Sequence, residues 1–171
     1  MDAYLAVVSK REVRDYAGRP IDPEAEQRIL EAGRVAGSSK NRQQRRFVVV
    51  RDEGAREEVA SSVYAGDNVR GAALVLAIVI GAKGPTAFDA GRAAQNMMLA
   101  ASNDGVGSCP NGIADAERLR AALGHGEDES VATVLTFGYP AKPRRDSESL
   151  PAAEWAARAA RRPREEIVSE V

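Results

Sequence analysis

Residues 72–80 form the longest uninterrupted apolar run in the sequence, and this run constrains the fold more than any other feature. A transmembrane helix needs about 20 consecutive apolar residues, so the run is too short to cross a bilayer. Its length and its β-branched residues are typical of a strand that is buried on both faces. Residues 47–50 form a shorter run of the same kind, and residues 131–137 predict a third strand. The sequence therefore predicts a buried sheet.

Acidic residues mark the expected beginnings of the helices. An aspartate caps a first turn well, and the proline after Asp22 suits the first helical position. The expected N-caps are Asp2, Asp22, Asp52, Asp89 and Asp115. The helix after Asp22 is expected to reach about Ala36, where Gly37 ends it in a left-handed turn. Residues 66–70 are expected to form a turn.

Composition limits the classes of function. A chain of 171 residues with 44% hydrophobic residues fits one domain with a substantial core. A net charge of -1 argues against broad neutralisation of nucleic-acid phosphates, and neither nucleic acid nor a membrane is an expected partner. The only cysteine, Cys109, and the only histidine, His125, leave no disulfide framework within one chain and make a zinc site improbable. We expect a cytoplasmic protein without a metal, a buried Cys109 thiol, and His125 in a surface turn.

Residues 37–46 are ten consecutive non-aliphatic residues between a helical pattern and an apolar run. They carry hydroxyls, side-chain amides and cations, a mixture of hydrogen-bond donors and acceptors that suits a planar, polar, partly anionic ligand. A solvated basic loop without a ligand is the alternative, because most loops are polar and exposed. The chemistry of the loop leaves both interpretations open.

Residues 30–43, followed by residues 46–50, resemble the helix, flavin-binding loop and strand of the nitroreductase family, which binds FMN. Two places depart from the family pattern: Gly37 stands where proline is common, and Gln44-Arg45 stands where Pro-Trp is common. The resemblance implies that the ribityl chain and ring edge of FMN are contacted by Ser38, Ser39, Asn41 and Gln43.

Two further segments resemble the same family. Residues 10–16 resemble its arginine-rich turn, which implies that the FMN phosphate meets Lys10, Arg11 and Arg14, with Arg11 the first choice and Glu12 turned away; self-paired charges on a solvated edge are the alternative. Residues 88–112 resemble its central helix and the segment beside the isoalloxazine ring. The methionines of that helix are expected in the core, and the implied ring contacts are Cys109, Pro110, Asn111 and Gly112.

The C-terminal part differs in character, because residues 141–162 are rich in alanine and arginine and poor in large apolar side chains. Residues 161–168 resemble the C-terminal motif of the family. This implies that Arg161 and Arg162 meet the FMN phosphate and that an apolar end adds a strand to the sheet of a second subunit. We therefore expect one domain over residues 1–140, an extension over residues 141–171 that wraps the partner, and a homodimer with FMN in its interface.

The resemblance implies an α+β fold with a mixed, mainly antiparallel sheet flanked by helices. It also implies an FMN-dependent oxidoreductase that passes electrons from NADPH or NADH to electron-poor acceptors such as quinones and nitroaromatics. Because the flavin carries the chemistry, no catalytic side chain is assigned. A flavin-destroying enzyme like dimethylbenzimidazole synthase and a non-catalytic FMN-storage protein are the alternatives. The short connection over residues 81–87 predicts an uncovered site of low selectivity.

Overall fold

The computed structural model describes residues 2–142 and 145–171. The chain divides into two compact units: Arg11–Pro143 is the larger, and Met1–Lys10 with Arg144–Val171 is the smaller. Among the described residues, no helix combines the length and the hydropathy needed to span a membrane.

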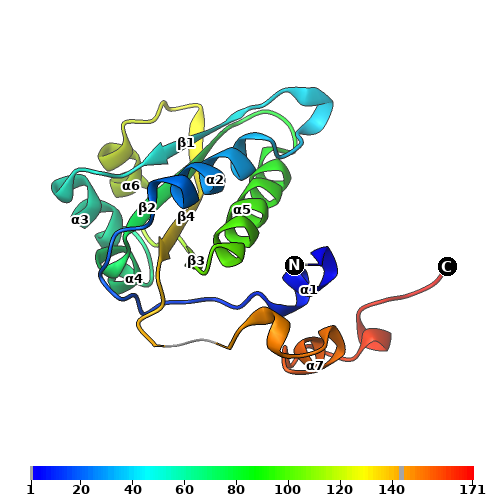
Figure 1. Ribbon diagram of the computed structural model, residues 1–171. Helices are drawn as coiled ribbons and strands as arrows, with labels where there is room; N and C mark the ends of the chain where they lie inside the picture. Colours follow the sequence, from blue (N-terminus) through cyan, green and yellow to red (C-terminus); the bar gives the residue numbers. More distant parts are fainter. Residues whose placement is uncertain (1, 143–144) are drawn as a thin grey trace. The chain divides into compact units, whose positions relative to one another are not determined.

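The larger unit is built on a four-stranded sheet with the order β1-β2-β4-β3, in which every neighbouring pair is antiparallel (Figure 1). The strands are β1 (Arg45–Val49), β2 (Leu74–Gly81), β3 (Gly107–Asn111) and β4 (Glu129–Gly138). The expected α+β fold is confirmed, and so is the buried strand within residues 72–80. Burial of both faces of the first strand is wrong, because β1 lies at an edge of the sheet and is only half-buried.

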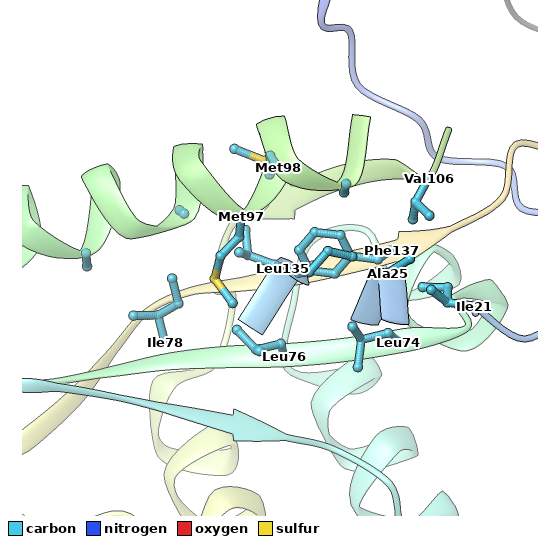
Figure 2. Close-up of a cluster of buried hydrophobic side chains, with 14 of the residues drawn as sticks. Ile21, Ala25, Leu74, Leu76, Ile78, Met97, Met98, Val106, Leu135 and Phe137 are labelled. Atoms are coloured by element: carbon cyan, nitrogen blue, oxygen red, sulfur yellow. The ribbon is translucent and has the colours of Figure 1, made fainter. Parts of the chain in front are cut away.

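Side chains alternate along β2 and divide the core into two clusters, as the two-residue period of a strand requires. Leu74, Leu76 and Ile78 join the cluster formed with α2 (Pro23–Arg34) and α5 (Thr86–Asn103), which Figure 2 shows. Val75 and Ala77 join the other cluster, which contains residues of α3 (Glu53–Ser61), α4 (Gly66–Gly71) and α6 (Ala116–Leu123). Met97 and Met98 belong to the first cluster, which confirms their place in the core.

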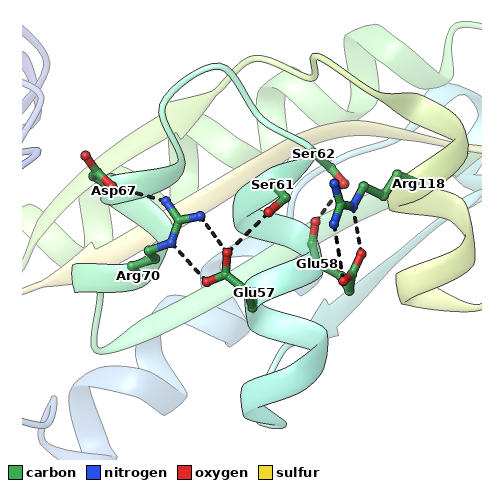
Figure 3. Close-up of polar contacts among 7 residues, drawn as sticks. All are labelled: Glu57, Glu58, Ser61, Ser62, Asp67, Arg70 and Arg118. Atoms are coloured by element: carbon green, nitrogen blue, oxygen red, sulfur yellow. Dashed lines mark hydrogen bonds and ion pairs between the residues drawn. The ribbon is translucent and has the colours of Figure 1, made fainter.

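Ion pairs connect the helices of the second cluster at the surface (Figure 3). Arg70 on α4 contacts Glu57 of α3 at 2.6 Å and Asp67 of its own helix at 3.1 Å. Arg118 on α6 contacts Glu58 of α3 at 2.7 Å. Helix α3 is therefore held to both of its neighbours by arginine–carboxylate pairs as well as by apolar contacts.

Four of the five expected N-caps lie at the N-cap position, and three of them cap the helix with their side chains. The carboxylates of Asp2, Asp52 and Asp115 accept backbone N–H groups three residues ahead, at 2.8 to 3.0 Å. Asp22 lies at the N-cap position of α2, but its carboxylate accepts the hydroxyl of Tyr139 at 2.8 Å instead of a helix amide. Asp89 is not a cap, because α5 already begins at Thr86.

Two expected backbone features are wrong. Helix α2 ends at Arg34 instead of reaching Ala36, and Gly37 does not adopt the left-handed conformation. Residues 66–70 lie in the short helix α4 and do not form a simple turn.

The smaller unit joins both ends of the chain. It contains α1 (Ala3–Ser9), the 3-10 turns η2 (Ser147–Ser149) and η3 (Arg164–Glu166), and α7 (Ala152–Ala157). Helix α1 packs against α7 and η2. Trp155 of α7 is buried, and its indole N–H donates to the carbonyl of Ser147 at 2.8 Å. Ile167 and Val168 remain 57% and 49% exposed.

Candidate functional site

The polar loop after α2 has an unusual backbone. Lys40, Asn41 and Gln43 adopt positive φ angles of 50°, 53° and 54°, a region that residues with a side chain seldom occupy. Within the loop, the Gln43 N–H donates to the hydroxyl oxygen of Ser38 at 3.0 Å. Asn41 and Gln43 are exposed, whereas Ser38 and Ser39 are half-buried. The loop therefore has one defined shape that presents the two amide side chains to solvent.

The start of this loop is held by α5. The carboxylate of Asp89 is only 7% exposed and accepts the backbone N–H of Ser39 at 3.0 Å. A buried carboxylate requires such a partner, because an unpaired one loses its hydration without compensation. Sequence reasoning assigned Asp89 to the helix end and missed its contact with the loop. The sequence itself offers no sign that the partner is Ser39.

Two arginines fill the space around the end of α2. A Cβ atom at Gly37 would lie 2.6 Å from Nη2 of Arg92, so the guanidinium occupies the room that glycine leaves. Arg45 donates from Nη2 to the carbonyl of Ala36 and lies 3.5 Å from that of Gly33. A cation at these carbonyls is favourable, since they carry the negative end of the helix dipole.

The segment that carries Arg11 and Arg14 runs beside β3. The Val13 N–H donates to the carbonyl of Ser108 at 3.0 Å, and Val13 is buried against Gly107. A Cβ atom at Gly107 would lie 2.5 Å from Cγ2 of Val13, so only glycine permits this approach. Arg14 is exposed and Arg11 is half-buried. The backbone that carries the two arginines is thus fixed through Val13, which lies between them.

A buried polar network lies under the same segment. The Tyr16 hydroxyl donates to the Val13 carbonyl at 2.8 Å and lies 2.9 Å from Oγ1 of Thr136. Asn111 Nδ2 donates to that Oγ1 at 3.2 Å and to the Cys109 carbonyl at 3.1 Å. Burial raises the pKa of Tyr16 to about 12, partly offset by the hydrogen bond with Thr136. The phenol therefore stays neutral as a hydrogen-bond donor.

This network changes the expected roles of two ring contacts. Cys109 is 2% exposed and Asn111 is 3% exposed, and Asn68 Nδ2 donates to Oδ1 of Asn111 at 2.9 Å. Both side chains are turned into the protein, so a ligand beside β3 meets the exposed Pro110 and Gly112 instead. The expected burial of the Cys109 thiol is confirmed.

The sequence profile of the Nitroreductase family matches residues 7–79 and 65–139. These ranges include the loop, the arginine segment and β3, and together they cover most of the chain. The chain belongs to the nitroreductase family. The resemblance recognised in the sequence is thereby confirmed.

Known relatives agree with this assignment. A protein of Archaeoglobus fulgidus, described as an NADH dehydrogenase/NAD(P)H nitroreductase, is 32% identical over 144 residues, which span 78% of this chain and 83% of the relative. A solved nitroreductase structure from Desulfovibrio desulfuricans, in complex with FMN, is 28% identical in sequence and superposes with a TM-score of 0.83. The match spans 100% of this chain and 98% of that structure's chain. The NADPH:FMN oxidoreductase of Vibrio harveyi in complex with NAD+ is 28% identical with a TM-score of 0.73, covering 81% of this chain and 71% of its own.

The departures from the nitroreductase pattern now have structural partners. Gly37, where proline is common in the family, leaves room for Arg92, and the guanidinium of Arg45 donates to a carbonyl at the end of α2.

Tyr64, which sequence reasoning did not select, is 81% exposed, and its backbone N–H donates to the carbonyl of Gly112 at 3.0 Å. Its ring lies against that glycine. An exposed aromatic ring therefore borders the expected flavin segment.

Three of the expected phosphate ligands lie in the smaller unit. They are Lys10, Arg161 and Arg162, and both arginines are exposed. The guanidinium of Arg161 donates to the carbonyl of Ala159 at 3.0 Å. Arg11 and Arg14 belong to the larger unit, so convergence of the two groups on one phosphate stays a prediction.

The expected surface position of His125 is wrong. His125 is 9% exposed and lines a pocket of about 390 Å³ between α6 and β4, with Leu119 and Val131 among the apolar walls. Nδ1 of His125 lies 3.3 Å from the carbonyl of Gly126. The local sequence of small residues suggested a turn, but the imidazole packs back onto the helix and strand that this turn connects.

Proposed function

We propose that this nitroreductase-family protein is an FMN-dependent oxidoreductase that takes electrons from NADH or NADPH and reduces electron-poor acceptors such as quinones and nitroaromatics. The observation that carries the proposal is the fixed loop over residues 38–43, which presents exposed amides beside the helix that anchors it. The relative from Desulfovibrio desulfuricans, described in complex with FMN, covers the whole of this chain at 28% identity.

The donor set of the described residues fits FMN. Arginines on a fixed extended segment suit the phosphate, because a guanidinium matches phosphate oxygens in a bidentate manner. In this proposal Arg11 and Arg14 hold the phosphate together with Lys10, Arg161 and Arg162. The amides and hydroxyls of the loop suit the ribityl chain and the polar ring edge, which are assigned to Ser38, Ser39, Asn41 and Gln43.

The flat side of the ring suits the end of β3, where Pro110 and the following Gly112 are exposed and the Tyr64 ring lies beside Gly112. Glycine allows a ring to approach the backbone closely. When bound, FMN supplies hydride transfer, and the residues of the chain supply position and electrostatics. Cys109 and Asn111 therefore act through the backbone and through the network that holds β3.

We also propose a cytoplasmic homodimer with FMN in its interface and residues 141–171 wrapped around the partner. Support comes from Ile167 and Val168, which remain 57% and 49% exposed at the end of the smaller unit. Exposed apolar residues at a chain end are suited to cover another surface. Removing the residues after Pro140 is expected to weaken dimerisation and FMN binding together. A truncated chain that remains a flavin-loaded dimer on sizing chromatography would contradict the exchange.

The acceptor class follows from the short connection between β2 and α5. Only residues 82–85 join the two elements, and these four are exposed. Such a connection forms a turn and not a lid, so we propose an open flavin face with weak discrimination among acceptors, since each additional contact contributes only about 1 to 3 kcal/mol. A panel of quinones and nitroaromatics ranked by kcat/KM tests this proposal.

The purified protein decides between the proposal and its alternatives. An absorption spectrum with flavin bands after reconstitution, together with steady oxidation of NADPH or NADH with a quinone, is the expected result. Loss of the flavin bands under oxygen without turnover would indicate flavin destruction, and stable bands without turnover would indicate storage. A protein that cannot be loaded with FMN would overturn all three. Arg11→Ala should raise the FMN dissociation constant while the melting temperature stays close to that of the parent.

A further inference from the structure

Arg42 and Lys83 are exposed cations that come from different parts of the chain to one place on the surface. Arg42 follows the 3-10 turn η1 (Ser39–Asn41) in the loop before β1, and Lys83 lies in the connection after β2. The guanidinium lies against the backbone of Gly84, where a Cβ atom would be 3.3 Å from Nη1 of Arg42. The Gly81 N–H donates to the carbonyl of Gln44 at 3.2 Å and holds the two segments together. Antiparallel pairing of β1 with β2 therefore brings the guanidinium within one residue of Lys83.

Neither cation has an ion-pair partner in the part of the chain that the structure describes. This contrasts with the arginines that flank them: Arg46 pairs with Glu129 at 3.0 Å, and Arg51, beyond the other end of β1, pairs with Glu26. The fold thus neutralises other exposed arginines of the same strand region and leaves this pair unneutralised.

Two carboxylates near the pair are engaged elsewhere or make no pair. Asp89, in the first turn of α5, is buried and accepts the N–H of Ser39. Asp128 approaches the connection through its backbone, since its carbonyl accepts the Ala82 N–H at 3.0 Å, and no ion pair joins it to Lys83 among the described residues. The surface at residues 42 and 83 therefore keeps a local positive charge although the whole chain has a net charge of -1.

A guanidinium fork next to an ammonium suits a phosphomonoester, which is a compact dianion with three acceptor oxygens. Arg42 lies between Asn41 and Gln43, which the proposed function places at the edge of the flavin. We propose that Arg42 and Lys83 bind the 2′-phosphate of NADPH and make the protein select NADPH over NADH. This inference rests on the proposed function, because it gives that function its electron donor.

The first test measures binding without turnover. The FMN-loaded protein is titrated by calorimetry at low salt with adenosine 2′,5′-bisphosphate and with adenosine 5′-monophosphate, which differ by the 2′-phosphate. We expect the bisphosphate to bind about tenfold or more tightly, as charge-assisted hydrogen bonds to phosphate predict. The double variant Arg42→Ala/Lys83→Ala should abolish the difference. Added salt should also reduce the difference in affinity between the two nucleotides, because salt screens exposed charges.

The second test measures selectivity. The double variant should lower kcat/KM for NADPH about tenfold more than kcat/KM for NADH. Arg51→Ala is the matched control, since it removes the same charge from a loop at the other end of β1. It should leave the NADPH-to-NADH ratio unchanged.

Three results would overturn the inference. Equal affinity of the parent for the two adenosine nucleotides would show that no 2′-phosphate site exists. An increased FMN dissociation constant in the double variant, with unchanged nucleotide selectivity, would assign the two cations to the phosphate of the flavin. Equal competition by orthophosphate would reduce the site to a general anion site. Failure of the proposed function gives a different result: neither NADPH nor NADH would reduce the protein. The calorimetric comparison of the two adenosine nucleotides would still decide whether a 2′-phosphate site exists.

Discussion

The carboxylate of Asp89 accepts the backbone N–H of Ser39 at 3.0 Å across 50 positions of the sequence. This bond ties the start of the polar loop to α5, the longest helix of the described chain. The loop adopts left-handed angles at three residues with side chains, and such angles persist only where surrounding contacts enforce them. The shape of the loop is therefore set by a helix and not by the loop sequence alone.

Asp89→Ala is expected to weaken FMN binding about tenfold, because a lost hydrogen bond to a charged group is worth about 1.5 to 3 kcal/mol and part of that energy holds the loop. Flavin fluorescence during titration of the apoprotein measures the change. Asp52→Ala is the matched control: it removes a carboxylate that caps α3 at 2.8 Å, and it should lower the free energy of unfolding by about 1 kcal/mol without changing FMN affinity. Unchanged FMN affinity in Asp89→Ala would refute the role of this bond.

Gly107→Ala is expected to displace the segment that carries Arg11, because the new Cβ would lie 2.5 Å from Val13. Overpacking of this kind lowers the free energy of unfolding by about 1 to 3 kcal/mol. FMN affinity should fall with it, as urea denaturation and flavin titration can show. Gly91→Ala lies in the exposed part of α5, where a new Cβ would meet nothing within 4 Å apart from its own helix backbone and chain neighbours, and should instead stabilise the protein by about 0.5 to 1 kcal/mol. Equal effects of the two substitutions would contradict the packing argument.

The raised pKa of Tyr16 predicts that the folded protein loses stability at alkaline pH. Its pKa is raised from 10.0 to about 12 in the folded protein, so the folded state favours the neutral phenol. The contribution to stability is fully present below pH 10 and is lost as pH rises through about 12, because the unfolded chain releases the proton first. Tyr16→Phe should flatten this part of the pH dependence and lower stability at pH 8 by about 1 kcal/mol. Melting temperatures of parent and variant between pH 8 and pH 11 provide the comparison; parallel curves would count against the assignment.

The lowered pKa of Glu129 predicts that the folded protein loses stability at acidic pH. The hydrogen bond from Arg46 and the backbone N–H of Gly126 lower the pKa of this carboxyl from 4.5 to about 2. Its contribution is present above pH 4.5 and is lost as pH falls through about 2. An NMR titration of the carboxyl carbon should show a pKa raised toward the ordinary value in Arg46→Ala, where only the Gly126 N–H still lowers it. The same titration of Arg51→Ala should show no change.

The sequence predicted the parts of the fold that local pattern determines. Residues 72–80 were sufficient to predict β2, since a run of this kind requires cover on both faces, and Asp52 and Asp115 predicted two helix starts through short-range bonds. Asp89 and Gly37 were misassigned because their partners, Ser39 and Arg92, are distant in sequence. Local preference gives no information about such partners.

The candidate site was predictable to a similar degree. The polar composition of residues 37–46 and the family resemblance identified the loop. The buried state of the Asn111 side chain depends on which face of β3 meets Asn68, and this face is fixed only when the strand pairs with β4. The neighbourhood of Arg42 and Lys83 likewise arises from pairing of β1 with β2. Register between strands is the physical information that the sequence reading lacked.

The two outer strands of the sheet also bear on how this protein avoids aggregation. Unpaired amide and carbonyl groups along a sheet edge can template the addition of another chain. On β3, the carbonyl of Ser108 already accepts the Val13 N–H. Just after β3, the carbonyl of Gly112 accepts the Tyr64 N–H. On β1, the exposed side chain of Arg46 places a charge beside the edge where a foreign strand would have to pair. The extended segment that carries Arg11 thus covers the β3 edge of the sheet. Substitutions that displace this segment would expose the edge and promote aggregation as well as weaken ligand binding.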